Sequence, residues 1–289
     1  MASPPPGRFP VAVSEIVFAF VVLAVQARFQ DRLNYERLSD PSDSIQSRPL
    51  LVRILFLQAA GVNARVRYYA VWGLSNAACI GSGLGFSGWD PHKGIASWSR
   101  GRNVDMLAFE FGSNFKEMLD VWNINTSVWL RNNVYKRVTP PGRRPGFRSL
   151  IVTFLVSAFW HGVAPGYYFT FLLGGFYQYL GRLLRKSVRP IFFENTRRPD
   201  PTLATFRQYT RAQIAYSVVC KVCSQMAINY TAMSFILLNV GPSIRAYRSV
   251  YWYGHVALVL GLAACHLGLP RLLRPLRTAP PVESKAKTT

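Results

Sequence analysis

The sequence predicts an all-α membrane protein that crosses the bilayer more than once, and two observations lead to that fold class. Half of the 289 residues are hydrophobic, and they are gathered into long runs, whereas a soluble protein mixes apolar and polar residues every few positions. Most of the basic residues lie between those runs, as the positive-inside rule requires of short cytosolic loops. We therefore expect a polytopic transmembrane helix bundle with re-entrant and interfacial helices.

The first apolar run, VSEIVFAFVVLAVQA, has the length of a signal peptide or of a short span, and the basic segment that follows it favours a span. The second, PLLVRILFLQAAG, is interrupted by Arg53 and is too short to cross alone, so a separate re-entrant or interfacial helix is expected. The third, YYAVWGLSNAACIGSGLGF, is long enough to span. Its Asn76 and its glycines indicate a helix that packs against protein.

Residues 87–149 are polar and aromatic, and no window among them is apolar enough to sit in lipid. Within this region, MLAFEFGSNFKEMLDVW places apolar side chains near helical spacing, which predicts amphipathic helices at the membrane interface. Turns are expected on both sides. GLGFSG matches G-x-G-x-x-G but follows a membrane-type run instead of a strand, and TPPGRRPG is rich in helix breakers.

A long apolar segment after residue 149 is interrupted by Gly-Val-Ala-Pro-Gly, which can end one helix and start another. His161 would then lie at a helix end inside the membrane zone. The basic segment from Arg182 to Arg211 is expected to be a cytosolic loop. Two further spans are expected in IAYSVVCKVCSQMAINYTAMSFILLNV and SVYWYGHVALVLGLAACHLGL.

The chain is therefore expected to form one transmembrane domain over residues 1–275, followed by a disordered, basic and Pro-rich cytosolic tail over residues 276–289. The ending KAKTT resembles the dilysine retrieval signal of endoplasmic reticulum membrane proteins, which acts only on a cytosolic tail. This ending favours the endoplasmic reticulum membrane as the location.

The net charge of +21 is compatible with two kinds of partner. Clustered Lys and Arg neutralise nucleic-acid phosphates, and they also flank apolar spans beside the anionic cytoplasmic leaflet. The sequence contains no zinc-finger spacing, basic zipper or RNP pattern. We therefore expect membrane lipids, and no nucleic acid, as partners.

The four cysteines fall inside or beside apolar runs and are typical of small hydrophobic residues. Cys220 and Cys223 form C-x-x-C, but no second pair or neighbouring histidine completes a zinc or redox motif. No metal site is expected. The sequence also lacks a G-x-S-x-G elbow, a P-loop and an H-E-x-x-H motif, which excludes the enzyme classes that depend on them.

An ionisable side chain in the bilayer zone is a candidate for function, because burying it there is costly. Four histidines compete for that role. His92 lies in a polar loop, and His255 and His266 have no acid or amide in the adjoining sequence, so core packing is the better interpretation for those two. His161 is surrounded by the small and rigid residues that a helix-end pocket needs.

A neutral imidazole in a desolvated site can act as a general base near pH 7. The polar stretch VWNINTSVWLR offers amides that could stabilise a developing oxyanion, or orient a hydroxyl, without adding charge. The residues alone leave the pairing of His161 with Asn123 open. Ser157, four residues before His161, could hydrogen-bond to it along a helix, although local packing is the better interpretation.

Two joined motifs carry a resemblance to a known family. W-N-x-N-T-x-x-W-L-R and F-W-H-G, within a region from about residue 68 to 238, resemble the membrane-bound O-acyltransferase family and, within it, the fungal lysophospholipid acyltransferases. The resemblance implies a bundle of transmembrane helices around a catalytic tunnel, with His161 as general base assisted by Asn123. The implied substrate contacts are Trp122, Asn125, Thr126, Trp129 and Trp160.

The implied reaction transfers an acyl chain from acyl-CoA, as co-substrate, to the free glycerol hydroxyl of a lysophospholipid, with no other cofactor. Members of that family are usually much longer and have additional N-terminal spans. A second hypothesis is therefore a truncated, non-catalytic relative that binds lipid or pairs with a partner membrane protein. A small transporter is disfavoured, because the sequence shows no inverted repeat or set of paired intramembrane charges.

Overall fold

The computed structural model describes residues 6–90, 94–143, 145–195, 200, 202 and 205–276. His92 lies outside the described residues, as does the expected disordered tail apart from its first residue. The described helices are α1 (Arg8–Phe29), α2 (Glu36–Ser39), α3 (Leu50–Gly81), α4 (Met106–Glu110), α5 (Phe115–Asp120), α6 (Ile124–Leu130), α7 (Phe147–His161), α8 (Pro165–Phe192), α9 (Arg211–Leu237), α10 (Val240–Ser249), α11 (Tyr253–Leu267) and α12 (Leu269–Leu272).

Shorter elements connect these helices. They are the 3₁₀ turns η1 (Ser44–Ser47), η3 (Phe206–Gln208) and η4 (Arg274–Leu276), the π-turn η2 (Arg131–Tyr135), and the antiparallel strands β1 (Gly88–Trp89) and β2 (Ala96–Ser97). The two strands hold two residues each. The all-α prediction is therefore confirmed.

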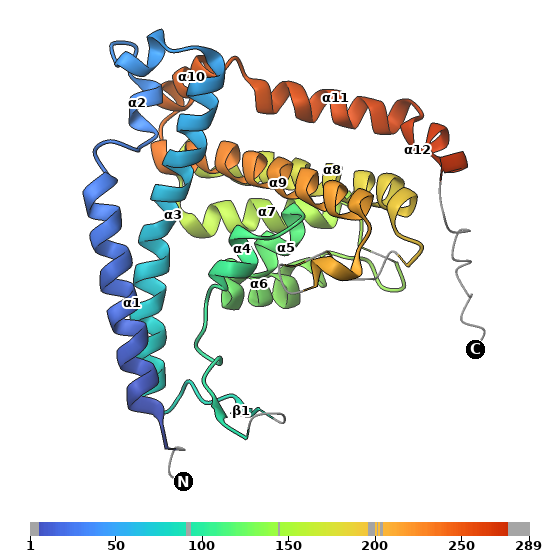
Figure 1. Ribbon diagram of the computed structural model, residues 1–289. Helices are drawn as coiled ribbons and strands as arrows, with labels where there is room; N and C mark the ends of the chain where they lie inside the picture. The colour runs from blue at the N-terminus through green and yellow to red at the C-terminus, as the bar shows by residue number, and fades with distance from the viewer. Residues whose placement is uncertain are drawn as a thin grey trace, which may run out of the picture.

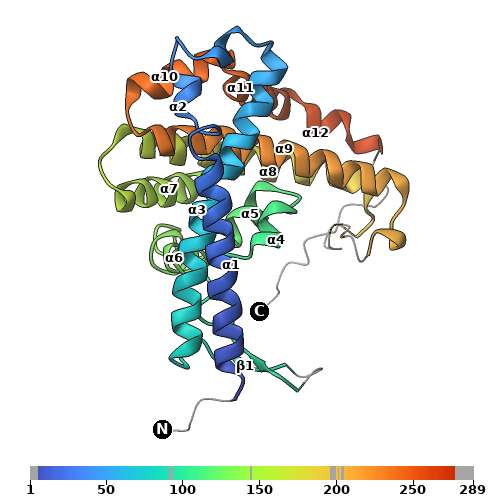
Figure 2. The same ribbon diagram turned by 60° about the vertical axis from the view of Figure 1, so that its left-hand side comes forward.

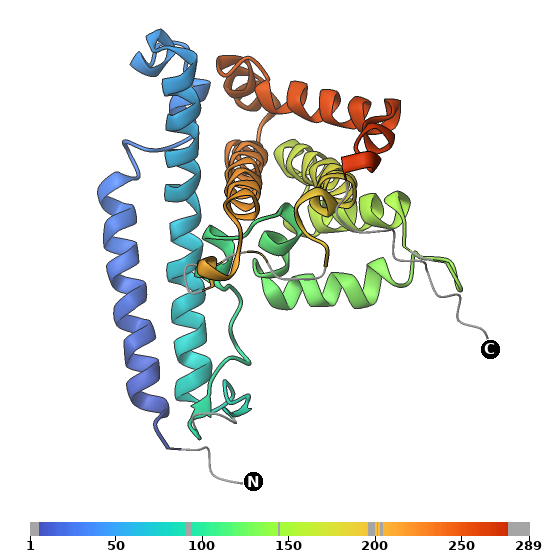
Figure 3. The same cartoon turned by 45° about the vertical axis from the view of Figure 1, so that its right-hand side comes forward.

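Helices α1 and α3 run antiparallel as a long pair at one side of the molecule (Figures 1 and 3). Helices α8 and α9 lie side by side, and α9 packs against α3. Helix α7 packs on α8 below them, and α11 covers the opposite side of α8 (Figures 1 and 2). The short helices α4, α5 and α6 fill the angle between α3 and the α7–α9 layer (Figure 1).

Close packing of small residues joins α1 to α3. Ala12 and Ala19 are buried on one face of α1, and a Cβ added at Gly73 of α3 would lie 3.3 Å from the Ala19 Cβ. Small residues at such positions let two helix backbones approach closely without a polar contact. The remaining faces of α1 are apolar and exposed, as expected of a helix in lipid.

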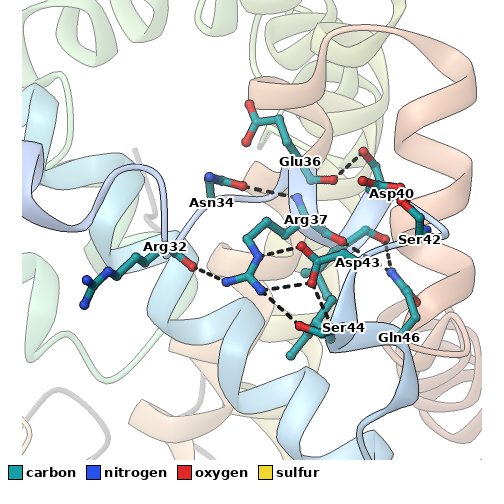
Figure 4. Close-up of polar contacts among 12 residues, drawn as sticks. Arg32, Asn34, Glu36, Arg37, Asp40, Ser42, Asp43, Ser44 and Gln46 are labelled. Carbon is teal, nitrogen blue, oxygen red and sulfur yellow. Dashed lines mark hydrogen bonds and ion pairs between the residues drawn. The ribbon is translucent and has the colours of Figure 1, made fainter.

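A short polar connection turns the chain from α1 to α3 (Figure 4). The Arg37 guanidinium donates to both carboxylate oxygens of Asp43, at 2.7 and 3.0 Å. The same carboxylate caps η1 by accepting from the Ile45 N–H. Because one side chain closes the turn and caps the helical turn after it, the direction of α3 is fixed at its start.

Helix α3 joins two segments that the sequence predicts to be separate. Leu50–Gly81 is one helix of 32 residues, so the prediction of a separate interfacial helix is wrong. No proline interrupts it, and its polar side chains find partners inside the protein. Asn63 donates to the carbonyl of Leu33, and Arg65 pairs with Glu110.

The expected basic loop between Arg182 and Arg211 is also shorter than predicted, because α8 continues to Phe192. Arg189, although charged, is 1% exposed and forms an ion pair with Asp200 from the connection that follows. This partner lets the last turns of α8 remain helical against the protein. The interpretation of that part as loop is therefore wrong.

Among the described residues, α1 is the one unbroken helix that is long and apolar enough to cross a membrane. Helices α10 and α11 meet the same test together, with a bend of 77° at the break between them. Helix α7 is apolar but has 15 residues, fewer than the roughly 20 that an untilted span needs. The described chain thus contains one candidate span, α1, or two if α10 and α11 together form a second span.

The largest hydrophobic core lies where the α2 region, α3, α8, α9, α10 and α11 meet. Tyr35, Leu38, Tyr230, Met233 and Val250 are almost fully buried in it. This core fixes α3 and α8 relative to α9. These three helices form walls of the site described below.

Candidate active site

A cavity of about 510 Å³ is lined by residues of the helices α3 to α9 and of η2. Apolar and aromatic residues make up somewhat more than half of its lining, and polar and charged side chains line the rest. Such a mixed lining suits a ligand that has both an apolar chain and a polar or charged part. Both members of the predicted pair, Asn123 and His161, line it.

His161 is the last residue of α7. Gly162 follows with φ 129°, a backbone conformation that stops the helix and favours glycine. Pro165 then opens α8 at a position where its missing N–H does no harm. The predicted helix break around His161 is therefore confirmed.

Four aromatic rings surround the His161 imidazole. Phe171 stacks on it with ring centroids 5.1 Å apart, Phe235 and Trp160 meet it edge-on at 5.0 and 4.6 Å, and Tyr167 lies at 5.6 Å. No described side chain forms a hydrogen bond with the ring. The imidazole nitrogens are thus held by ring packing and keep their hydrogen-bonding capacity for a ligand.

Asn123 lies at the start of α6, in a left-handed conformation with φ 47° and ψ 54°. Asparagine tolerates this region better than most residues. Its side-chain oxygen accepts a hydrogen bond from the amide of Asn103 at 2.9 Å. The amide of Asn123 is therefore fixed at the cavity wall by a neighbouring segment.

The structure brings some of the predicted site residues together and leaves others apart. Trp122 and Thr126 line the same cavity as the predicted pair. Asn125, Trp129 and Trp160 are not among the lining residues, and the two tryptophans are 53% and 58% exposed. Trp160 contacts the site through the His161 ring.

The remaining candidates, Ser157, His255 and His266, have different surroundings. Ser157 lines the cavity but makes no hydrogen bond to the His161 ring. The ring nitrogen Nδ1 of His255 lies 2.6 Å from the buried Tyr230 hydroxyl, so the core interpretation of His255 is confirmed. The His266 ring stacks on Tyr179 near the end of α11 but is exposed, so the core interpretation of His266 is wrong.

The model of the membrane-bound O-acyltransferase family matches residues 2–225, most of the chain. The chain belongs to the membrane-bound O-acyltransferase family. The resemblance seen in the two motifs is therefore confirmed, and the protein is a member of a family of membrane proteins.

Relatives in this family include two fungal proteins and one plant protein. The lysophospholipid acyltransferase of Schizosaccharomyces pombe is 40% identical over 217 residues, which is 75% of this chain and 41% of that protein. That of Saccharomyces cerevisiae is 40% identical over 215 residues, 74% of this chain and 33% of that protein. Lysophospholipid acyltransferase 2 of Arabidopsis thaliana is 31% identical over 272 residues, 93% of this chain and 55% of that protein.

The chain thus spans between 33% and 55% of the length of these O-acyltransferase relatives. The matched part includes both predicted site residues, since the family model covers the segments that carry Asn123 and His161.

Sequence reasoning missed an aromatic wall that α3 contributes to the cavity of this O-acyltransferase family member. Tyr68 and Trp72 line the cavity, and their rings pack against Trp122, with centroids 5.6 and 4.9 Å from it. Their spacing of four residues places both on one face of α3. That spacing was a usable signal, but nothing in the sequence showed which element the face meets.

A buried polar network behind the cavity was also missed. Arg65 lines the cavity and donates to both oxygens of Glu110 at 2.6 Å. It also donates to Gln225 at 3.1 Å and to Asn229 of α9. Arg65 is a charged residue between two apolar runs, and this position was a signal that could have identified the network.

Two further arginines, Arg131 and Arg182, line the cavity. Neither forms an ion pair with an acidic side chain in the described part of the chain. Arg131 begins the π-turn η2, a local irregularity that is frequent at functional sites. Guanidinium groups without an acidic partner are suited to bind phosphate through paired hydrogen bonds.

Proposed function

We propose that the protein is an acyl-CoA-dependent lysophospholipid O-acyltransferase. The observation that carries this proposal is the one cavity that His161 and Asn123 both line. Relatives of this chain bear the name lysophospholipid acyltransferase. The products would be a phospholipid and free coenzyme A.

His161 acts as the general base in this proposal. The free glycerol hydroxyl of the lysophospholipid loses its proton to the imidazole while its oxygen forms a bond with the thioester carbonyl carbon. The bond between that carbon and sulfur then breaks, and the proton passes from His161 to the leaving thiolate. General-base catalysis of this kind contributes about 10²- to 10⁴-fold in rate.

Asn123 stabilises the oxygen that becomes negative when the carbonyl is attacked, or orients the attacking hydroxyl. A neutral amide does this without adding a charge to an apolar site. Trp122 and Thr126, which line the cavity, contact the substrate. The reaction uses acyl-CoA as a co-substrate and needs no other cofactor.

Phosphate recognition falls to Arg131 and Arg182 in this proposal. Both substrates carry phosphate groups, and both arginines line the cavity without an acidic partner among the described side chains. The apolar lining accommodates the acyl chain. Membrane lipids surround the protein.

We further propose that the protein is a multi-pass protein of the endoplasmic reticulum membrane whose helices enclose a catalytic tunnel. The support for a membrane location is the family and the apolar helix α1. The endoplasmic reticulum is the location that we expect from the sequence.

An acyl-transfer assay in membranes tests the function. Labelled acyl-CoA and a lysophospholipid are supplied to membranes that contain wild-type protein, His161→Ala or Asn123→Ala. We expect label in phospholipid with wild type, and a loss of about 10²-fold or more with the histidine variant.

His266→Ala is the matched control, because His266 is an exposed histidine outside the cavity lining. It should keep wild-type activity. Correctly inserted wild-type protein without transfer would favour the non-catalytic hypothesis, and full activity of His161→Ala would contradict the assigned base.

A further inference from the structure

We propose that Asn103 is a positioning residue that decides which end of the Asn123 amide faces the cavity. This inference rests on the proposed function, in which Asn123 acts on the reacting oxygen. Asn103 precedes α4 and is separated from Asn123 by helices α4 and α5. It does not line the cavity, so it acts through Asn123.

Three hydrogen bonds join Asn103 to the start of α6. Its side-chain amide donates to Asn123 Oδ1 at 2.9 Å. Its own Oδ1 accepts from the backbone N–H of Asn125 at 3.1 Å, and its backbone carbonyl accepts from the N–H of Ile124 at 2.9 Å. The bridge between Val104 and Trp122 continues the same pairing.

The orientation of both amides follows from this pattern. A backbone N–H can only donate, so the group of Asn103 that faces Asn125 N–H must be its oxygen. Its –NH₂ group therefore faces Asn123, and the group that receives this bond must be the oxygen of Asn123. The hydrogen-bond network thus shows which terminal atom of each amide is the oxygen and which is the nitrogen. The shape of either side chain alone would leave this assignment ambiguous.

This orientation decides which group of Asn123 is left for a ligand in the cavity. With Oδ1 of Asn123 occupied, its –NH₂ group remains, and no described residue accepts a hydrogen bond from it. This group can donate to a developing oxyanion or to the attacking hydroxyl. The reversed amide would present an acceptor oxygen to a negative oxygen, which would repel it.

Asn103→Asp separates this role from a structural one. The aspartate has nearly the same shape and still accepts from Asn125 N–H, but it cannot donate to Asn123 Oδ1. Asn123 then turns its –NH₂ group toward the carboxylate and its oxygen toward the cavity. We expect kcat to fall by about tenfold or more, with the apparent KM for lysophospholipid and the Tm close to wild type.

Two matched variants complete the test. Ala108→Asp adds the same charge at an exposed position on α4 and should keep wild-type kcat. The double variant Asn103→Asp/Asn123→Ala should be no slower than Asn123→Ala alone, because Asn103 acts only through Asn123. A structural role would instead give additive losses and a lower Tm.

The outcomes are distinguishable. Wild-type kcat in Asn103→Asp, with a slow Asn123→Ala variant, overturns the positioning role and leaves the proposed function standing. Wild-type kcat in Asn123→Ala, or an inactive wild-type protein, overturns the proposed function and this inference with it. Slow Asn103→Asp with unchanged Tm and no additivity supports the inference.

Discussion

The backbone N–H of Gly166 donates to the carbonyl oxygen of Leu238 across 2.6 Å. Leu238 has φ 60° and ψ −46°, and the Asn239 N–H bonds back to the Leu237 carbonyl. These are the features of the rare γ-turn with positive φ, which is strained for leucine. The bond ties the first turn of α8, which follows His161, to the end of α9.

Gly166→Ala should loosen that junction. A Cβ at Gly166 would lie 2.7 Å from both the Cα and the carbonyl oxygen of Leu238, so one of the two helices must move. We expect the free energy of unfolding to fall by about 1–3 kcal/mol and acyl transfer to fall with it. Thermal unfolding in detergent and the membrane assay measure the two effects.

Gly181→Ala is the matched control in the same helix. A Cβ at Gly181 would meet no atom within 4 Å. It should therefore raise the free energy of unfolding by about 0.5–1 kcal/mol, because alanine favours a helix more than glycine does. Equal effects of the two substitutions would refute the close contact at Gly166.

The Arg65–Glu110 pair gives a second prediction. The Arg65 side chain is 8% exposed, so Arg65→Met leaves the Glu110 carboxylate without its main partner beside the Tyr69 hydroxyl, which donates to it at 2.6 Å. We expect a loss of about 3–5 kcal/mol in the free energy of unfolding, measured by denaturation in detergent.

The double variant Arg65→Met/Glu110→Met should be more stable than Arg65→Met, since no unpaired buried charge remains. Losses that simply add in the double variant would mean that the two side chains are not coupled.

A third prediction concerns acid stability of the α1–α3 connection. The hydrogen bonds from Arg37 hold the pKa of Asp43 below its usual range. A carboxylate with a lowered pKa stabilises the fold fully above its unfolded pKa of about 3.9 and loses that contribution as pH falls through the lower folded value. Asp43→Asn should therefore lower stability by about 1 kcal/mol at neutral pH.

The stability difference between wild type and Asp43→Asn should stay constant above about pH 5 and shrink below about pH 4. Unfolding at pH 7, 5 and 3.5 measures it. Asp31→Asn, at an exposed position of the same connection, should show no such difference. A gap that widens toward low pH would contradict the assigned sign.

The start of α9 provides a fourth prediction. The Thr210 hydroxyl accepts from the Gln213 N–H, and the Gln213 side chain accepts from the Thr210 N–H, which forms a capping box. Thr210→Ala should cost about 1 kcal/mol of stability. Thr210→Ser keeps the hydroxyl and should remain near wild type, so equal destabilisation by both substitutions would rule out the cap as the cause.

Several features of the site could be predicted because they depend on local sequence. Gly162 is a local signal that ends one helix, and Pro165 is a local signal that begins the next. The helix break beside His161 could therefore be predicted from the residues around it. The family was also evident from two motifs separated by about thirty residues. The polar stretch that carries Asn123 could also be recognised from the local sequence.

Other features depended on partners that are distant in the sequence. Leu50–Gly81 is one helix because Arg65 meets Glu110 and Asn63 meets Leu33, and no local pattern reveals those contacts. The basic end of α8 stays helical because Arg189 meets Asp200. In both segments a polar residue by itself predicts a break in the helix. An ionic or polar partner offsets the cost of burying that residue, so the helix continues.

The sequence by itself determined the helical class and the family, and it singled out His161 and Asn123 as the candidate site residues. Only the tertiary structure decided that these two side chains share one cavity, that Tyr68 and Trp72 line it, and that Asn103 orients the Asn123 amide. The physical reason is that helix periodicity and helix breakers act over a few residues. The cavity, in contrast, is lined by side chains from seven helices and η2, whose packing no local pattern specifies.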